Sequence, residues 1–196
     1  MTGVSGANVE GNARITGALG AVIFVLLLVE GITIPGVRGH ITIHVVVGMV
    51  LVAFVAAKIA TTTYRFARYY AGQRDYVEKG PPPRVLRLLG PLVTLSTIAV
   101  LATGVAAVLD TGDARVVLFA HKAAFVLWFG FMTVHVLGHV LETPALAFAD
   151  WRRARRRQAP GALARFAALA AALALGVVLG IVSRGWAHTW HHLHAR

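Results

Sequence analysis

The sequence predicts an all-α fold: an integral membrane helical bundle with five transmembrane helices, the N-terminus inside and the C-terminus outside. Of its 196 residues 57% are hydrophobic and 14% are charged, and the mean hydropathy is +0.70, which is more apolar than soluble domains are. The apolar residues gather into stretches of the ~20 residues that a helix needs to cross a ~30 Å hydrocarbon core. The basic residues gather in two connections between these stretches.

The five helices are expected at 14–34, 40–63, 88–109, 115–141 and 162–183. The first lacks a basic start and a small-residue cleavage pattern, so we expect a retained helix rather than a signal peptide. The connections "PGVRGH" and "DTGDA" are short enough to predict tight turns between antiparallel neighbours. The segment "YRFARYYAG" is expected to extend the second helix into the membrane interface, and "GPPPR" to end it.

Three parts of the chain follow from this assignment. Residues 1–13 are expected to form a tail, residues 14–185 the bundle with a core at 40–141, and residues 186–196 an outer tail rich in histidine. The fifth helix is Ala-rich and has no polar residue in its middle, so it is expected to serve packing or anchoring. Whether the outer tail "WAHTWHHLHAR" binds a metal stays open, because it has no carboxylate or cysteine nearby.

The formal net charge of +11 is concentrated on one side of the predicted membrane. The connection after the second helix carries Arg65, Arg68, Arg74, Lys79, Arg84 and Arg87, and the one after the fourth carries Arg152, Arg153, Arg155, Arg156, Arg157 and Arg165. Because short Lys- and Arg-rich loops stay in the cytoplasm, this pattern sets the predicted orientation. The expected partner of these loops is anionic lipid rather than nucleic acid, and the expected location is the cell membrane, in a bacterium the inner membrane.

The sequence lacks the residues that several kinds of catalytic or binding site require. The chain has no cysteine, which excludes disulfides, thiolate metal sites and covalent haem attachment through Cys-x-x-Cys-His. It also has no paired carboxylates, no nucleophile with a base and no nucleotide-binding loop. The sequence therefore identifies no catalytic residue, and any haem must be held non-covalently.

Histidines within the apolar stretches are the candidate site residues. At ~100° per residue His121, His135 and His139 share one helix face, with His135 ~21 Å further along than His121. His40 and His44 lie one turn apart on the second helix, at a depth similar to that of His121. Ionisable residues inside a membrane span are rare and usually functional.

The facing pair His44 and His121 predicts the two axial ligands of a haem iron held between helices two and four. Gly48, one turn from His44, would let a macrocycle approach the backbone. Two alternatives stay open. In the first, the histidines only make hydrogen bonds between helices. In the second, His40, His44 and His121 form a three-nitrogen site of a haem-free metal-ion or proton transporter, with His135 and His139 as an inner station.

The pair of His44 with His121, and the step of fourteen from His121 to His135, resemble the small membrane-bound b-type cytochromes and the ferric-reductase-like transmembrane proteins. The resemblance covers mainly residues 40–141. It implies haem b, electron transfer across the membrane, and a quinone or a redox partner protein as the electron partner. A structural anchor subunit of a redox enzyme remains an alternative, and a homo-oligomer stays open.

The chain departs from that family at one position. The second haem of the family would require a histidine fourteen residues after His44, where this chain has Lys58. We therefore expect one haem rather than two, with His135 and His139 free for a quinone or a proton. Lys122, Arg38 and Arg115 are candidates to pair with haem propionates, and Glu30 is expected to be an interfacial acid.

Overall fold

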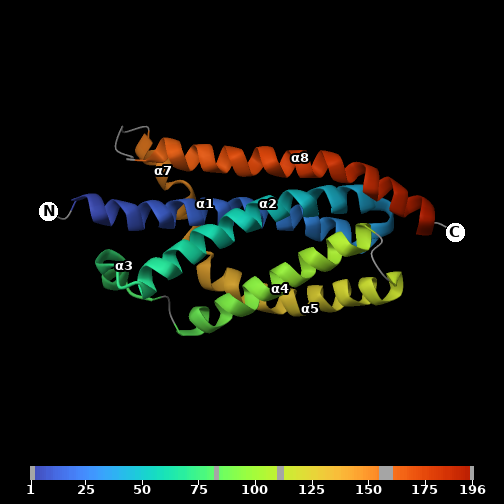
Figure 1. Cartoon of the computed structure of the whole chain (residues 1–196), viewed down its shortest axis with the longest axis horizontal. Coiled ribbons are helices and arrows are strands. Elements are labelled where there is room, and N and C mark those ends of the chain that lie inside the picture. Colours follow the sequence, from blue (N-terminus) through green and yellow to red (C-terminus); the bar gives the residue numbers. More distant parts are fainter. Residues whose placement is uncertain (1–2, 82–83, 110–112, 155–160, 195–196) are drawn as a thin grey trace.

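The computed structural model describes residues 3–81, 84–109, 113–154 and 161–194. Within these residues the chain is all-helical and contains no strand. The elements in order are α1 (Gly3–Thr33), the 3₁₀ turn η1 (Ile34–Gly36), α2 (Val37–Tyr70), α3 (Arg74–Lys79), α4 (Arg84–Val108), α5 (Ala114–His139), α6 (Thr143–Ala147), α7 (Ala149–Ala154) and α8 (Ala162–His194). The long helices lie roughly along one axis and form an elongated bundle (Figure 1).

The described residues contain four helical stretches that are long and apolar enough to cross a membrane: Asn8–Tyr70, Arg84–Val108, Ala114–His139 and Ala162–Trp186. Large apolar side chains on their outer faces are exposed, among them Ile32, Leu88, Phe119 and Leu163. An apolar surface of this extent is unfavourable in water and suits lipid tails. The predicted membrane class is thus supported, with the first stretch containing α1, η1 and α2 together.

The chain reverses direction within that first stretch. Pro35 lies in η1, and His40 has non-helical backbone angles of φ −119° and ψ 16°, so the helix cannot continue straight. Beyond the reversal α2 lies antiparallel to α1, with Lys58 Nζ donating to the Thr16 carbonyl at 2.6 Å (Figure 1). We call the end with η1 and Asp113 the turn end, and the opposite end, with α3 and α7, the basic end.

Helix boundaries differ from the sequence prediction mainly beyond the lipid-crossing parts. The segment 1–13 was expected as a tail, yet α1 begins at Gly3, and α8 runs on to His194. The second helix extends beyond residue 63 as expected, since α2 reaches Tyr70. It was expected to end at "GPPPR", which is wrong, because the chain leaves the helix ten residues earlier through Gly72, a residue with positive φ. The short helix α3 was not predicted; it begins after Gly72 and ends at Gly80, both with positive φ, and its Tyr76 is 4% exposed.

Helix α8 packs closely on α2 through two glycines one turn apart. A Cβ atom on Gly176 would lie 3.2 Å from Cγ1 of Val50, and one on Gly180 would lie 3.2 Å from Cγ1 of Val46. Small residues at this spacing let two helix backbones approach, which is how membrane helices gain van der Waals contact where no hydrophobic effect drives them together. The expected packing role of the fifth predicted helix is consistent with this contact.

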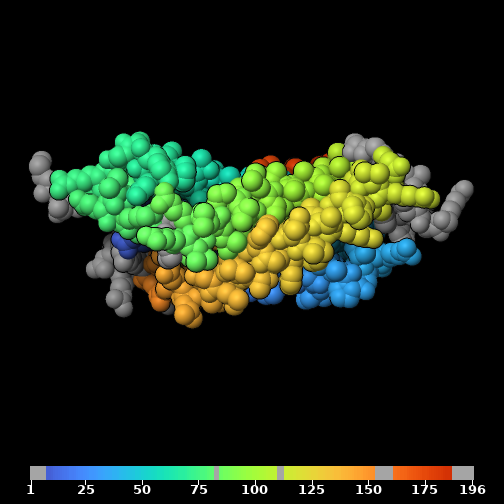
Figure 2. All heavy atoms as spheres, turned by 90° about the horizontal axis from the view of Figure 1, so that it is seen from below, coloured from blue at the N-terminus to red at the C-terminus, as the bar shows by residue number. Residues whose placement is uncertain are grey.

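Helices α4 and α5 form a second antiparallel pair. Asp113 caps the start of α5, its side chain accepting from the Arg115 amide at 2.8 Å. Midway along the pair, Trp128 Nε1 donates to Thr97 Oγ1 at 3.0 Å, and both residues are 9% exposed. Figure 2 shows the two helices side by side along one face of the molecule. They touch α2 and α8 much less than they touch each other.

Buried charges join three helices at the basic end. Asp150 on α7 accepts from Arg14 on α1 at 3.1 Å and from two nitrogens of Arg165 on α8, one of them at 2.7 Å. Arg14 and Asp150 are 5% and 7% exposed. Burial alone would raise the pKa of the Asp150 carboxyl, but the hydrogen bonds and charges of Arg165 and Arg14 outweigh burial and lower this pKa below its ordinary value.

Replacing Gly176 by Ala should destabilise the bundle by about 1–3 kcal/mol, because the new methyl group would press on the Val50 backbone and side chain. Gly185→Ala on the same helix is the matched control, since nothing lies within 4 Å of its Cβ position, and it should be neutral or slightly stabilising. Thermal unfolding in detergent, followed by circular dichroism, measures both. Equal effects of the two substitutions would contradict the packing described for α8.

Replacing Asp150 by Asn should lower the free energy of unfolding at pH 7 by about 3 kcal/mol, because it removes the buried carboxylate that Arg14 and Arg165 share and leaves Arg14 with Glu10 as its acidic partner. The folded-state pKa of Asp150 is depressed, so its contribution is fully present above about pH 4 and is lost as pH falls through the folded-state pKa. Denaturation in detergent at pH 7 and at pH 3 should show the difference between wild type and Asp150→Asn shrinking at the lower pH. Glu78→Gln, which breaks an exposed pair with Arg74, should cost little.

Candidate functional site

The two histidines of the predicted pair meet between α2 and α5 near the turn end. The ring centroids of His44 and His121 are 6.3 Å apart, and the ring planes are inclined at 85°. Helices α2 and α5 are not packed against each other along their lengths, since their close neighbours are α1 and α8 for α2 and α4 for α5. The contact between α2 and α5 at this level is therefore made by the imidazole pair.

Residues at the turn end of α1 hold the His44 ring. His44 Nδ1 lies 3.0 Å from Thr33 Oγ1 and 3.3 Å from Glu30 Oε1. The hydroxyl proton of Thr33 is already donated to the Glu30 carbonyl at 2.6 Å, so Thr33 can only accept from the ring. The proton of His44 is thereby assigned to Nδ1.

Helix α4 holds the His121 ring in the same way. His121 Nδ1 lies 3.1 Å from the Val100 carbonyl oxygen and 3.2 Å from Thr103 Oγ1. A carbonyl can only accept, so His121 also carries its proton on Nδ1. Gly104 gives the ring room, because a Cβ atom there would lie 3.1 Å from His121 Cε1.

Both imidazoles therefore present the Nε2 lone pair. Among the described residues no hydrogen bond involves Nε2 of His44 or His121. A histidine that donates Nδ1–H to a carbonyl, hydroxyl or carboxylate and keeps Nε2 free is arranged as metal-ligating histidines are. Each ring can therefore offer one unprotonated nitrogen, Nε2, to a metal ion.

The remaining predicted site residues at this end have other surroundings. His40 is exposed, and its Nδ1 bonds the Gly36 carbonyl at 2.9 Å, so it stabilises the chain reversal. A Cβ atom on Gly48 would lie 3.3 Å from Glu30 Oε1, which places this glycine against the carboxylate. Lys122 is exposed and makes no hydrogen bond or ion pair to another described residue.

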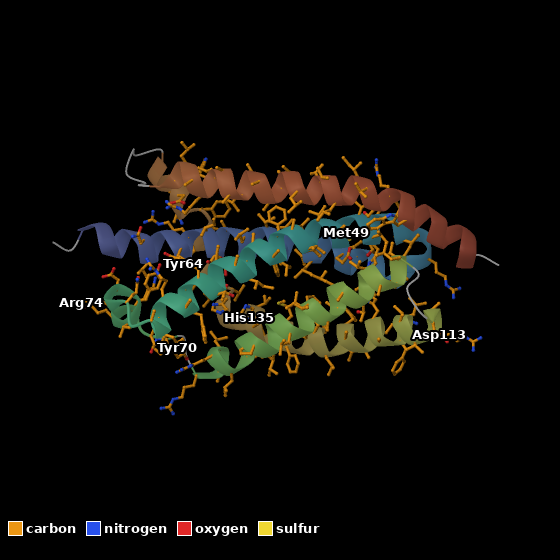
Figure 3. All side chains as sticks on the ribbon, in the orientation of Figure 1. Met49, Tyr64, Tyr70, Arg74, Asp113 and His135 are labelled. Atoms are coloured by element: carbon orange, nitrogen blue, oxygen red, sulfur yellow. The ribbon has the colours of Figure 1, made fainter. Side chains whose placement is uncertain are left out.

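The inner predicted residues form a separate cluster toward the basic end, where Figure 3 labels His135. His135 and His139 have ring centroids 4.8 Å apart, and His135 Nδ1 is buried without a partner in the described part of the chain. Lys58 is near enough to act electrostatically on both rings, while its Nζ donates to the Thr16 carbonyl. The position that the resemblance singled out thus does face the inner histidines.

Sequence reasoning missed the residues that orient the two rings. Glu30 was expected to be an interfacial acid, yet its side chain is only 16% exposed and lies against His44. Thr33, Thr103 and Gly104 were not singled out at all. A hydroxyl residue inside an apolar span was the available signal, but most such hydroxyls bond their own helix, as Thr103 also does.

The three-nitrogen site considered for His40, His44 and His121 is not assembled. Over the described ranges no group of three or more histidine or acidic side chains is placed to hold a metal ion, and His40 is engaged at the reversal. The side chains of His188, His191, His192 and His194, in the expected outer tail, lie outside the described residues.

Comparison of the chain with protein-family models, curated proteins and solved structures finds no match. Function must therefore be argued from the geometry and chemistry of the site itself.

Proposed function

We propose that this chain is a membrane-bound b-type cytochrome that binds one haem b through His44 and His121 and transfers electrons within the membrane. The observation that carries the proposal is the facing pair of imidazoles, 6.3 Å apart, each with Nδ1–H engaged and Nε2 available. Haem b would supply reversible one-electron exchange at its iron. The residues of the chain would hold and orient this haem.

The donor set suits the iron of a haem. Two imidazoles on one iron, each with its nitrogen ~2 Å from the metal and about 1 Å from its own ring centre, have centroids about 6 Å apart, close to the 6.3 Å found. Inclined rings are compatible, because each ligand turns freely about its bond to the metal. A porphyrin between α2 and α5 would not have to push closely packed helices apart, because these two helices are not packed against each other.

We further propose five membrane crossings, with α1 and α2 as separate spans. The reversal at η1 and His40 lies between them, and each of the two helices has more than the ~20 residues required. The Arg- and Lys-rich connections gather at one end of the bundle, where α3 and α7 lie (Figure 1). The positive-inside rule then puts the basic end and the N-terminus in the cytoplasm, and His44 and His121 near the outer surface of a bacterial inner membrane.

The electron partner in this proposal is a quinone in the lipid or a redox partner protein at the outer surface. The chain contributes orientation of the ligands by Thr33 and by the Val100 carbonyl. It also contributes exclusion of water by the surrounding apolar helices. Lys58 supports a single haem, because an ammonium bonded to a backbone carbonyl has no lone pair to offer a second iron.

Replacing His44 or His121 by Ala should abolish the low-spin bis-imidazole spectrum, because each removes one of the two ligands. His40→Ala is the matched control and should keep the Soret band and haem content of wild type. Absorption spectra of protein purified from haem-supplied cells, with pyridine haemochrome quantification, measure this. A wild-type protein without a Soret band, and with stoichiometric zinc or copper instead, would support the haem-free transporter.

Haem content should be close to one per chain, and His135→Ala and His139→Ala should leave the spectrum almost unchanged, because both lie ~21–27 Å from His121 along α5. Quantification of haem per protein in wild type and both variants tests this. Two haems in wild type and one in His135→Ala would show that the inner cluster also ligates iron.

A further inference from the structure

The two proposed ligands differ in the charge of the groups behind them. His121 Nδ1–H faces the Val100 carbonyl and the Thr103 hydroxyl, both neutral. His44 Nδ1–H faces the Thr33 hydroxyl and, at 3.3 Å, Glu30 Oε1. The site therefore has one neutral side and one side with a carboxyl group in contact with the ligand.

Glu30 is held in this place by the hairpin itself. Thr33, one turn further along α1, donates to the Glu30 backbone carbonyl and accepts from His44, so it ties the ring to the turn of α1 that carries Glu30. On the opposite helix Gly48 leaves the space that the carboxyl occupies, since a Cβ atom there would come within 3.3 Å of Oε1. The contact with His44 thus combines a side chain of glutamate length on α1 with a glycine at position 48, where a larger residue would crowd the carboxyl.

The surroundings of Glu30 supply no other cation. Among the described residues His44 is the group within ion-pair distance of its carboxyl, and the second oxygen, Oε2, is buried without a hydrogen-bond partner. The other ionisable groups toward the turn end whose side chains the structure describes are Arg38 and His40 on α2, Asp113 before α5, Arg115, His121 and Lys122 on α5, and Arg184 on α8. A buried carboxylate without a cation is costly, so the positive charge of an iron bound to the adjacent His44 would favour the ionised form of Glu30.

We propose that Glu30 is a positioning residue that acts through His44 to stabilise the oxidised form of the bound iron and so to lower its reduction potential. This rests on the proposed haem ligation. A carboxylate beside Nδ1–H polarises the imidazole and makes it a better electron donor at Nε2, and a negative charge near the iron favours the more positive oxidation state. Hydrogen bonding behind an axial ligand is one of the means by which a protein sets haem potentials.

The decisive variant is Glu30→Gln, which keeps the side-chain shape and an acceptor oxygen but removes the charge. The midpoint potential, measured by spectroelectrochemical titration of the purified full chain at one fixed pH, should shift to more positive values, with the low-spin spectrum and haem content retained. Glu30→Asp keeps the charge but withdraws it from the ring, so it should give an intermediate potential. Glu78→Gln, an equal charge change on exposed α3, should leave the potential at its wild-type value.

The outcomes separate the two proposals. A potential that is unchanged or more negative in Glu30→Gln, in a protein that still shows the His44 and His121 low-spin spectrum, overturns the role of Glu30 and leaves haem binding intact. An equal shift in Glu78→Gln overturns it too, since the effect would then be one of net charge. If Glu30→Gln does not retain haem, Glu30→Asp decides: a wild-type potential overturns the inference and a positive shift supports it. A wild-type protein without haem instead removes the proposed function.

Discussion

An imidazole in the apolar part of a membrane bundle must satisfy its ring proton inside the protein, and the turn end of this structure is organised around that requirement. His44 and His121 each donate Nδ1–H to acceptors on the preceding helix of their own antiparallel pair. Because an unpaired polar group in hydrocarbon costs several kcal/mol, these bonds fix the ring orientation as well as the protonated nitrogen. The Nε2 lone pair of each ring is left without a hydrogen bond among the described residues, with the two ring centroids 6.3 Å apart.

Small side chains make this arrangement sterically possible. Gly104 lets His121 lie on α4, Gly48 leaves room for the Glu30 carboxyl, and Gly176 and Gly180 let α8 approach α2. In water the hydrophobic effect would draw helices together without such close fits, but lipid tails compete equally for apolar surface. The glycines therefore act on function indirectly, by setting the distances at which polar side chains meet.

The sequence predicted the parts of this structure that depend on hydrophobicity along the chain. Apolar length located the helices, and the 3.6-residue period placed His121, His135 and His139 on one face. It did not locate the helix ends, since α1 begins at Gly3, nor α3, whose formation depends on the burial of Tyr76. The contact between Glu30 and His44 was not predicted, although the turn at "PGVRGH" was, because which side chains meet across that turn depends on how α1 packs against α2.

The short sequence distance between each histidine and its hydrogen-bond acceptor has a consequence for folding in the membrane. His44 finds its Thr33 acceptor 11 residues away, and His121 finds the Val100 carbonyl 21 residues away. Each ring is thus oriented within a single helical hairpin, which can form as soon as its two helices have left the ribosome and entered the bilayer. Assembly of the turn end then amounts to the docking of two hairpins in which the His44 and His121 rings are already oriented.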